Sequence, residues 1–199
     1  MEFMLVLYED PGLVATEQQR KEAVQRVGEY AMGQVGDGEA SDSLLRYVTR
    51  RASQMPYAEH AVTVNRPARE VFDYLADGTH NREWRAGVLE IERTSADGGE
   101  GATYRQVLAG PGGRRIDGDY RVTVFDPPRR LEFRVIAGPA RPAGVFELTE
   151  NPDRTTRVRF ALDLKPAGLM KLMTPVITRQ VRHEVAQLDT LKTVLERTS

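Results

Sequence analysis

A stretch of thirty residues near the C-terminus places the strongest constraint on what this chain can fold into. Between Gly168 and Arg197, apolar side chains return every three or four residues, which is the spacing of one face of an α-helix. The face carries Met170, Met173, Ile177, Val181, Leu188, Leu191 and Leu195. The helix is predicted to be about 28 residues long, which at 1.5 Å per residue is about 42 Å. An apolar stripe of that length has to be covered by a sheet or by other helices.

One carboxylate interrupts this stripe. Glu184 falls in its middle, and a buried carboxylate has to be paired or protonated. One hypothesis makes Glu184 a general acid or base, with Gln180 one turn earlier in the same site. The alternatives are an ion pair with an arginine, a hydrogen bond to Tyr104 or Tyr120, or a helix end that reaches into water.

The middle of the chain is predicted to form an antiparallel sheet. Its segments alternate apolar and polar residues, and Gly-, Pro- and Asp-rich turns separate them. The alternation indicates one solvated face and one covered face. The predicted strands are 57–64, 87–94, 102–109, 114–125, 130–137, 143–149 and 157–165. Two short helices are predicted after the first strand, at 67–77 and 80–84, the first opened by its proline.

The first 54 residues form a separate unit in this interpretation. Residues 3–8 are predicted to be a strand, residues 16–32 a helix with one apolar face, and residues 39–54 a linker. The apolar face of this helix consists of Ala23, Val27, Tyr30 and Ala31. The opening MEFMLVLYED, a polar helix and a Gly-rich turn resemble the start of YCII-related (DGPF-type) proteins, which are ferredoxin-like α+β domains that form dimeric barrels. The resemblance covers residues 1–38 and implies a truncated β-α appendage. We expect this appendage to mediate a homodimer.

The order of elements from residue 55 onward is strand, two short helices, six strands and a long helix. This order resembles the START/SRPBCC superfamily, in particular its polyketide cyclase/dehydrase-type and lipid-transport-like branch. The segments that carry the resemblance are HAVTVNRPAREVFDYLAD at 60–77, EWRAGVLEIER at 83–93, GDYRVTVFDPPRRLEFRV at 118–135 and the terminal helix. The resemblance covers 55–199. It implies an α+β helix-grip fold, in which a seven-stranded antiparallel sheet wraps around the long helix and leaves a cavity.

A cavity between sheet and helix predicts a hydrophobic ligand, although the same side chains could form a solid core. The candidate ligand-binding residues are Trp84, Tyr104, Tyr120, Phe133, Phe146, Phe160, Met170, Met173, Ile177 and Val181. Because one fold hosts many functions, three hypotheses stay open. The chain binds a lipid, polyketide or aromatic molecule; or it is a cyclase- or dehydrase-like enzyme that uses Glu184 with a tyrosine; or it is a non-catalytic regulatory or interaction module.

Composition argues against several other functions. The chain has no cysteine, and its three histidines are far apart in sequence, so we expect no metal site and no cofactor. The net charge of −1 gives no electrostatic basis for binding nucleic acid. No stretch is long and apolar enough to span a bilayer, and the N-terminus lacks the pattern of a signal peptide. We therefore expect no stable membrane insertion and a cytoplasmic location.

Overall fold

The computed structural model describes residues 57–164 and 174–197, without the side chains of Pro111 and residues 174–177. The predicted N-terminal unit, the linker and the first turns of the predicted C-terminal helix lie outside these residues. The elements, in chain order, are β1 (Tyr57–Val64), α4 (Ala68–Ala76), η1 (Gly78–His80), α5 (Asn81–Trp84), β2 (Val88–Arg93), β3 (Thr103–Ala109), η2 (Pro111–Gly113), β4 (Arg115–Asp117), β5 (Tyr120–Asp126), β6 (Arg130–Val135), β7 (Ala143–Glu150), β8 (Thr156–Asp163), α6 (Thr174–Ala186) and α7 (Leu188–Arg197).

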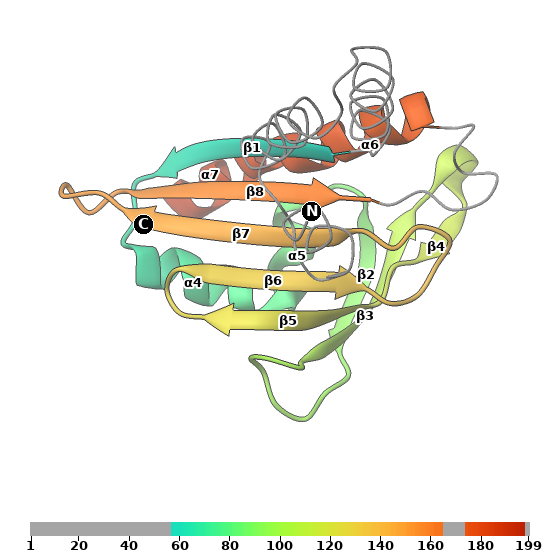
Figure 1. Cartoon of the computed structure of the whole chain (residues 1–199), viewed down its shortest axis with the longest axis horizontal. Helices are drawn as coiled ribbons and strands as arrows, with labels where there is room; N and C mark the ends of the chain where they lie inside the picture. Colours follow the sequence, from blue (N-terminus) through green and yellow to red (C-terminus); the bar gives the residue numbers. More distant parts are fainter. Residues whose placement is uncertain (1–56, 165–173, 198–199) are drawn as a thin grey trace, which may run out of the picture.

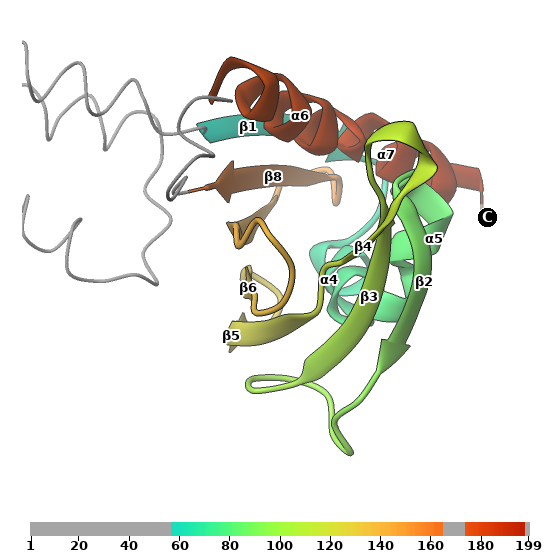
Figure 2. The ribbon, with the colours of Figure 1, turned by 90° about the vertical axis from the view of Figure 1, so that its right-hand side faces the viewer.

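The strands form one antiparallel sheet that curls, as Figure 1 shows. Its order is β1-β8-β7-β6-β5-β3-β2, with the short strand β4 paired to β3. The first and last strands are therefore neighbours, and β1 and β2 lie at opposite edges. Because β2 follows β1 in sequence, the chain has to cross the sheet between them. It does so through α4, η1 and α5, which lie inside the curl (Figure 2).

The C-terminal helices close the same concave side of the sheet. Helix α6 packs against β1 and β8, and α7 packs against β1 and α5. Val181, Val185, Leu188, Leu191 and Leu195 of these helices are all buried, and they belong to the main core cluster with the inward residues of the sheet. The apolar stripe predicted from the sequence is thus confirmed for its described part.

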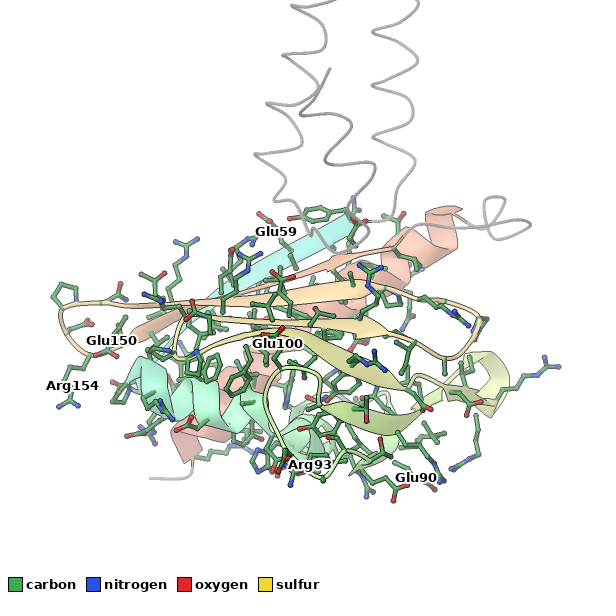
Figure 3. All side chains as sticks on the ribbon, turned by 60° about the horizontal axis from the view of Figure 1, so that its bottom comes forward. Glu59, Glu90, Arg93, Glu100, Glu150 and Arg154 are labelled. Carbon is green, nitrogen blue, oxygen red and sulfur yellow. The ribbon has the colours of Figure 1, made fainter. Side chains whose placement is uncertain are left out.

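Helix α4 shows how local sequence places an element over the sheet. Val71, Phe72 and Leu75 recur at helical spacing and are buried against the core. Pro67 precedes the helix in extended conformation, and it offers no side-chain cap because its ring carries no hydrogen-bond acceptor. Instead, a carboxylate oxygen of Glu150, at the end of β7, accepts the N–H of Ala68 at 2.8 Å. Figure 3 shows Glu150 beside the β7–β8 turn that carries Arg154.

Aromatic side chains fill the centre of the concave face. Phe146 of β7 and Phe160 of β8 are register partners, and their rings stack at a centroid distance of 4.2 Å. Trp84 packs edge-on against both rings, at 6.2 and 6.3 Å. Only 2% of Trp84 is exposed, so this side chain belongs to the core that anchors α5 to the sheet.

The predicted strand over 114–125 is two strands, so the sheet has eight strands and not seven. The break falls at Gly118 and Asp119. A carboxylate oxygen of Asp119 accepts the backbone N–H of Gln106 at 3.0 Å, while the Gly118 N–H donates to the carbonyl of the same residue at 2.8 Å. A side chain at position 118 would collide with Leu108. The side-chain hydrogen bond replaces a strand-to-strand bond here and interrupts the ladder.

The predicted uninterrupted helix is also divided, because α6 ends at Ala186 and α7 begins at Leu188. Gln187 lies between them and is 9% exposed. Its side-chain oxygen accepts the backbone N–H of Ala86 at 2.6 Å, and its amide nitrogen donates to Glu184 at 3.1 Å. Gln187 thus binds the backbone after α5 at the point where the apolar stripe passes from α6 to α7.

Candidate ligand pocket

A pocket lies between the concave face of the sheet and the helices that cross it. Strands β3, β5, β6 and β7 form one side, and α4, α5 and the residue that follows α5 form the other. The lining residues are Leu75, Ala76, Asn81, Arg85, Tyr104, Tyr120, Val122, Leu131, Phe133 and Phe146. The cavity volume is about 20 Å³, which is space for about one water molecule. The pocket is thus narrow, with closely spaced walls.

Four aromatic side chains form the wall of this pocket on the side of the sheet. Tyr104 and Tyr120 stack at 4.9 Å with nearly parallel rings, and Phe133 lies 5.4 Å from Tyr120. Phe133 in turn is 6.1 Å from Phe146. The ring of Phe133 covers Gly144 of the neighbouring strand so closely that a side chain there would overlap it. Aromatic faces in this arrangement suit a flat, ring-bearing molecule.

The tyrosine hydroxyls introduce polarity at one end of the wall. Tyr104 donates to the carbonyl of Ala76 at 3.2 Å, and the side-chain amide of Asn81 lies 3.5 Å from the Tyr120 hydroxyl. Burial raises the pKa of Tyr120 above its ordinary value, and the neighbouring Tyr104 adds to this rise. Tyr120 therefore presents a protonated hydroxyl at neutral pH. The hydroxyl lies against Gly78, where any larger residue would overlap it.

Arg85 brings a positive charge to the same pocket. It follows α5 directly, is 8% exposed, and lies with its guanidinium carbon 5.8 Å from the centre of the Trp84 ring. Its Nε lies 2.5 Å from Oε1 of Glu184 on α6, and the other carboxylate oxygen accepts from Gln187. The guanidinium is thus held in place from the C-terminal helix. Its two terminal nitrogens make no hydrogen bond within the described part of the chain.

Glu184 takes one of the arrangements that the sequence left open, an ion pair with an arginine. Both carboxylate oxygens have hydrogen-bond partners, and Glu184 is not among the residues that line this pocket. Gln180, predicted to share its site, is exposed. A role of Glu184 as catalytic acid or base stays a prediction. Its geometry is that of a residue that positions Arg85.

The other sequence candidates separate into three groups. Tyr104, Tyr120, Phe133 and Phe146 line the pocket as expected of ligand-binding residues. Trp84, Phe160 and Val181 are buried in the core and are not among the lining residues. Met170, Met173 and the side chain of Ile177 lie outside the described residues.

Sequence reasoning missed Arg85 and Asn81 as pocket residues. Both belong to the short helical segment that ends in Trp84, and a charged residue directly after a buried tryptophan was the available signal. Its partner Glu184 is 99 positions away in the chain, so only the fold brings the two charges together.

Two further features are absent from residues 57–164 and 174–197. No group of three or more histidine, cysteine, aspartate or glutamate side chains in this part of the chain is arranged to hold a metal ion. None of the described helices has the length and apolar character needed to cross a membrane.

Comparison with known proteins agrees with this geometry. The family described as "Polyketide cyclase / dehydrase and lipid transport" matches residues 55–196. No curated protein matches the sequence. Among solved structures, a protein of Thermus thermophilus aligns with a TM-score of 0.63 at 16% identity, covering 72% of this chain and 99% of that one.

Two further structures carry descriptive names. The ZhuI aromatase/cyclase of a Streptomyces species aligns with a TM-score of 0.60 at 22% identity, covering 72% of this chain and 94% of the other. A START superfamily protein of Mycobacterium smegmatis aligns with a TM-score of 0.55 at 12% identity, covering 72% and 99%. These likenesses show the helix-grip fold. The family match over residues 55–196 shows that the chain belongs to the polyketide cyclase/dehydrase and lipid transport family.

Proposed function

We propose that the chain binds a hydrophobic, ring-bearing small molecule that carries an oxygen substituent, in the pocket between the sheet and its helices. The observation that carries this proposal is the presence of a buried guanidinium, Arg85, in the lining of a pocket walled by four aromatic side chains. The family includes proteins of lipid transport and polyketide chemistry, which is consistent with a hydrophobic ligand.

The polar end of the pocket supports an oxygen substituent on the ligand. Glu184 engages Nε of Arg85, which leaves the terminal guanidinium nitrogens as donors. The Tyr120 hydroxyl and the Asn81 amide lie at the same end. A phenolate, enolate, carbonyl or carboxylate oxygen suits these donors, while the rings of the ligand stack on the aromatic wall.

The narrow cavity sets a condition on binding. A volume of about 20 Å³ does not admit a ring, so the aromatic wall and the helices have to separate as the ligand enters. Burial of apolar surface contributes about 25 cal/mol per Å². The observed affinity is this gain minus the free energy of opening.

The single tryptophan of the chain, Trp84, supplies the test, since it contacts Phe146 at the edge of the pocket. We expect a hydroxylated anthraquinone to change Trp84 fluorescence saturably and a palmitate probe to do so less. Arg85→Met should lower the affinity for the hydroxylated probe about tenfold, as the loss of one charge-assisted hydrogen bond predicts. It should leave the affinity for anthracene unchanged. Arg121→Met, an exposed arginine on β5, is the matched control. An unchanged spectrum with every probe, or an equal loss for anthracene, contradicts the proposal.

A cyclase- or dehydrase-like activity is the second candidate, and the protonated Tyr120 hydroxyl beside Arg85 favours it. In this proposal the enol carbon of a poly-β-ketone attacks one of its own carbonyl carbons, and Arg85 stabilises the oxyanion that develops there. Tyr120 donates its proton to that oxygen as the C–C bond forms, and the proton released by the enol oxygen restores the hydroxyl. Glu184 then acts by holding Arg85. Turnover of a poly-β-ketone probe that falls in Tyr120→Phe while probe affinity is retained supports catalysis. Unchanged turnover in Tyr120→Phe and Glu184→Gln contradicts it.

A further inference from the structure

The outer, convex face of the sheet contains side chains that are buried. Val145 of β7 and Ala161 of β8 are register partners that point away from the core, and both have an exposed fraction of 0%. Glu132, the partner of Val145 on β6, is 8% exposed, and Asp163 is 7% exposed. Within residues 57–164 and 174–197, the helices α4 to α7 all lie on the concave side (Figure 2).

Charged side chains surround this apolar centre. Arg159 reaches Glu59 at 2.6 Å, Glu147 at 2.5 Å and the Tyr57 hydroxyl at 2.9 Å. Arg130 pairs with Glu132 at 2.6 Å and also with Glu147. Figure 3 shows Glu59 on β1 at this surface. We name the set the outer patch: Tyr57, Glu59, Arg130, Glu132, Ala143, Val145, Glu147, Arg159, Ala161 and Asp163.

The composition of the outer patch indicates what kind of surface would be complementary to it. Its centre is apolar, since Tyr57 and Ala143 pack against Val145 and Ala161. Its four carboxylates outnumber its two guanidiniums by two. A partner for such a surface has an apolar face flanked by excess positive charge.

The 56 residues that precede β1 have a net charge of −3, but they contain both features locally: an apolar helix face and, next to the sheet, a run of basic residues. They join the sheet at Tyr57, which is itself part of the outer patch and the register partner of Asp163. The helix predicted over residues 16–32 has an apolar face, and residues 44–56 carry Arg46, Arg50 and Arg51 without an acidic residue. The covalent connection also gives this segment a high effective concentration at the outer patch, whereas a second copy has to be recruited from solution.

We propose that the N-terminal helix predicted over residues 16–32 docks with its apolar face on the outer patch of the same chain. The basic linker then runs beside the patch carboxylates. This interaction is on the opposite side of the sheet from the ligand pocket, so it is independent of the proposed function.

Thiol labelling tests this proposal, since the chain has no native cysteine. Val145→Cys in the full chain should react with a maleimide at least tenfold more slowly than Ile136→Cys, whose native side chain is 40% exposed; tenfold corresponds to about 1.4 kcal/mol. Adding Val27→Asp on the apolar face of the predicted helix should remove this protection. The matched control, Gln25→Asp on its polar face, should keep it. Ala161→Cys is expected to behave as Val145→Cys does and replaces it if that variant does not fold.

Two results overturn the proposal. Protection that persists in the Val27→Asp chain means that neighbouring side chains of the sheet cover Val145. Protection that disappears on dilution, together with a fall in mass by sedimentation, means that a second copy covers the patch.

Discussion

Arg85 and Glu184 connect the short helix α5 to the C-terminal helix α6 through a 2.5 Å contact between Nε and Oε1. The side chains are only 10% and 18% exposed, so solvent screens the pair weakly. Arg85 also lines the pocket, and Glu184 does not. The pair therefore links the polar end of a candidate ligand site to the element that closes the fold.

Glu184→Gln should lower the free energy of unfolding by about 3 kcal/mol, because it leaves a buried guanidinium without its carboxylate. The double variant Glu184→Gln/Arg85→Met should lose less than the sum of the single losses, since it removes both charges. Urea denaturation measures all of these values. Glu92→Gln is the control, because its pair with Arg105 is 61% exposed on both sides and should contribute less than about 1 kcal/mol. Equal losses of unfolding free energy in Glu184→Gln and Glu92→Gln would contradict a special stabilising role of the buried Arg85–Glu184 pair.

Gly144→Ala should reshape the pocket. The added methyl group overlaps the ring of Phe133, which has to move into the pocket space. Overpacking of this kind costs about 1–3 kcal/mol, and we also expect weaker probe binding by Trp84 fluorescence. Adding Phe133→Leu should recover stability in part. Gly87→Ala, where nothing lies within 4 Å of the new methyl group, serves as the control and should change neither quantity.

Stability should decrease at alkaline pH, and Tyr120 should account for part of the decrease. Burial raises the folded-state pKa of Tyr120 above the value of about 10 that an unfolded chain has. Below about pH 10 the hydroxyl is neutral in both states, so Tyr120 adds no pH dependence to the free energy of unfolding. Above that pH the tyrosine ionises in the unfolded state first, which stabilises the unfolded state and lowers the free energy of unfolding. Urea denaturation of Tyr120→Phe at several pH values should give a shallower decrease. Burial also raises the pKa of Tyr57 and Tyr74, so the decrease should persist in reduced form. A slope identical to that of the parent chain contradicts this assignment.

Gln187→Leu should destabilise the chain although it makes the apolar stripe more regular. The backbone N–H of Ala86 loses its acceptor at 2.6 Å, and Glu184 loses a donor. An unpaired buried group costs about 1–3 kcal/mol, which thermal or urea unfolding measures. Gln180→Leu, at an exposed position of the same helix, is the control and should lie within about 0.5 kcal/mol of the parent. A stabilised Gln187→Leu protein would mean that the break between α6 and α7 does not depend on this side chain.

The sequence predicted the strands and helices well because alternation and helical spacing are local signals, whereas their helix-grip arrangement was implied by the family resemblance. The strand at 57–64, most of the strand predicted at 130–137 and the buried face of α4 follow from such patterns alone. The two breaks were missed for a common reason. Asp119 and Gln187 each use a side chain to bind a backbone N–H of another segment, and nothing in the local pattern distinguishes them from surface residues.

The candidate site was predictable only in its apolar half. Tyr104 and Phe133 alternate with polar neighbours, so their inward direction can be read from the strand pattern. Arg85 lies in an irregular segment after α5, where no periodicity assigns a side chain to a face. Glu184 was singled out because it interrupts an apolar stripe, but its partner depends on how α5 and α6 pack.

The charged network on β8 has a consequence for how the strands align. Arg159 and Phe160 are adjacent, so they face opposite sides of the sheet: Arg159 bridges Glu59 and Glu147, and Phe160 stacks on Phe146. A slip of one residue would carry the guanidinium into the aromatic interior and the phenyl ring out of it. A one-residue slip would therefore cost free energy both by burying the charge of Arg159 and by exposing the ring of Phe160. These two neighbours thus favour a single register of β1, β8 and β7.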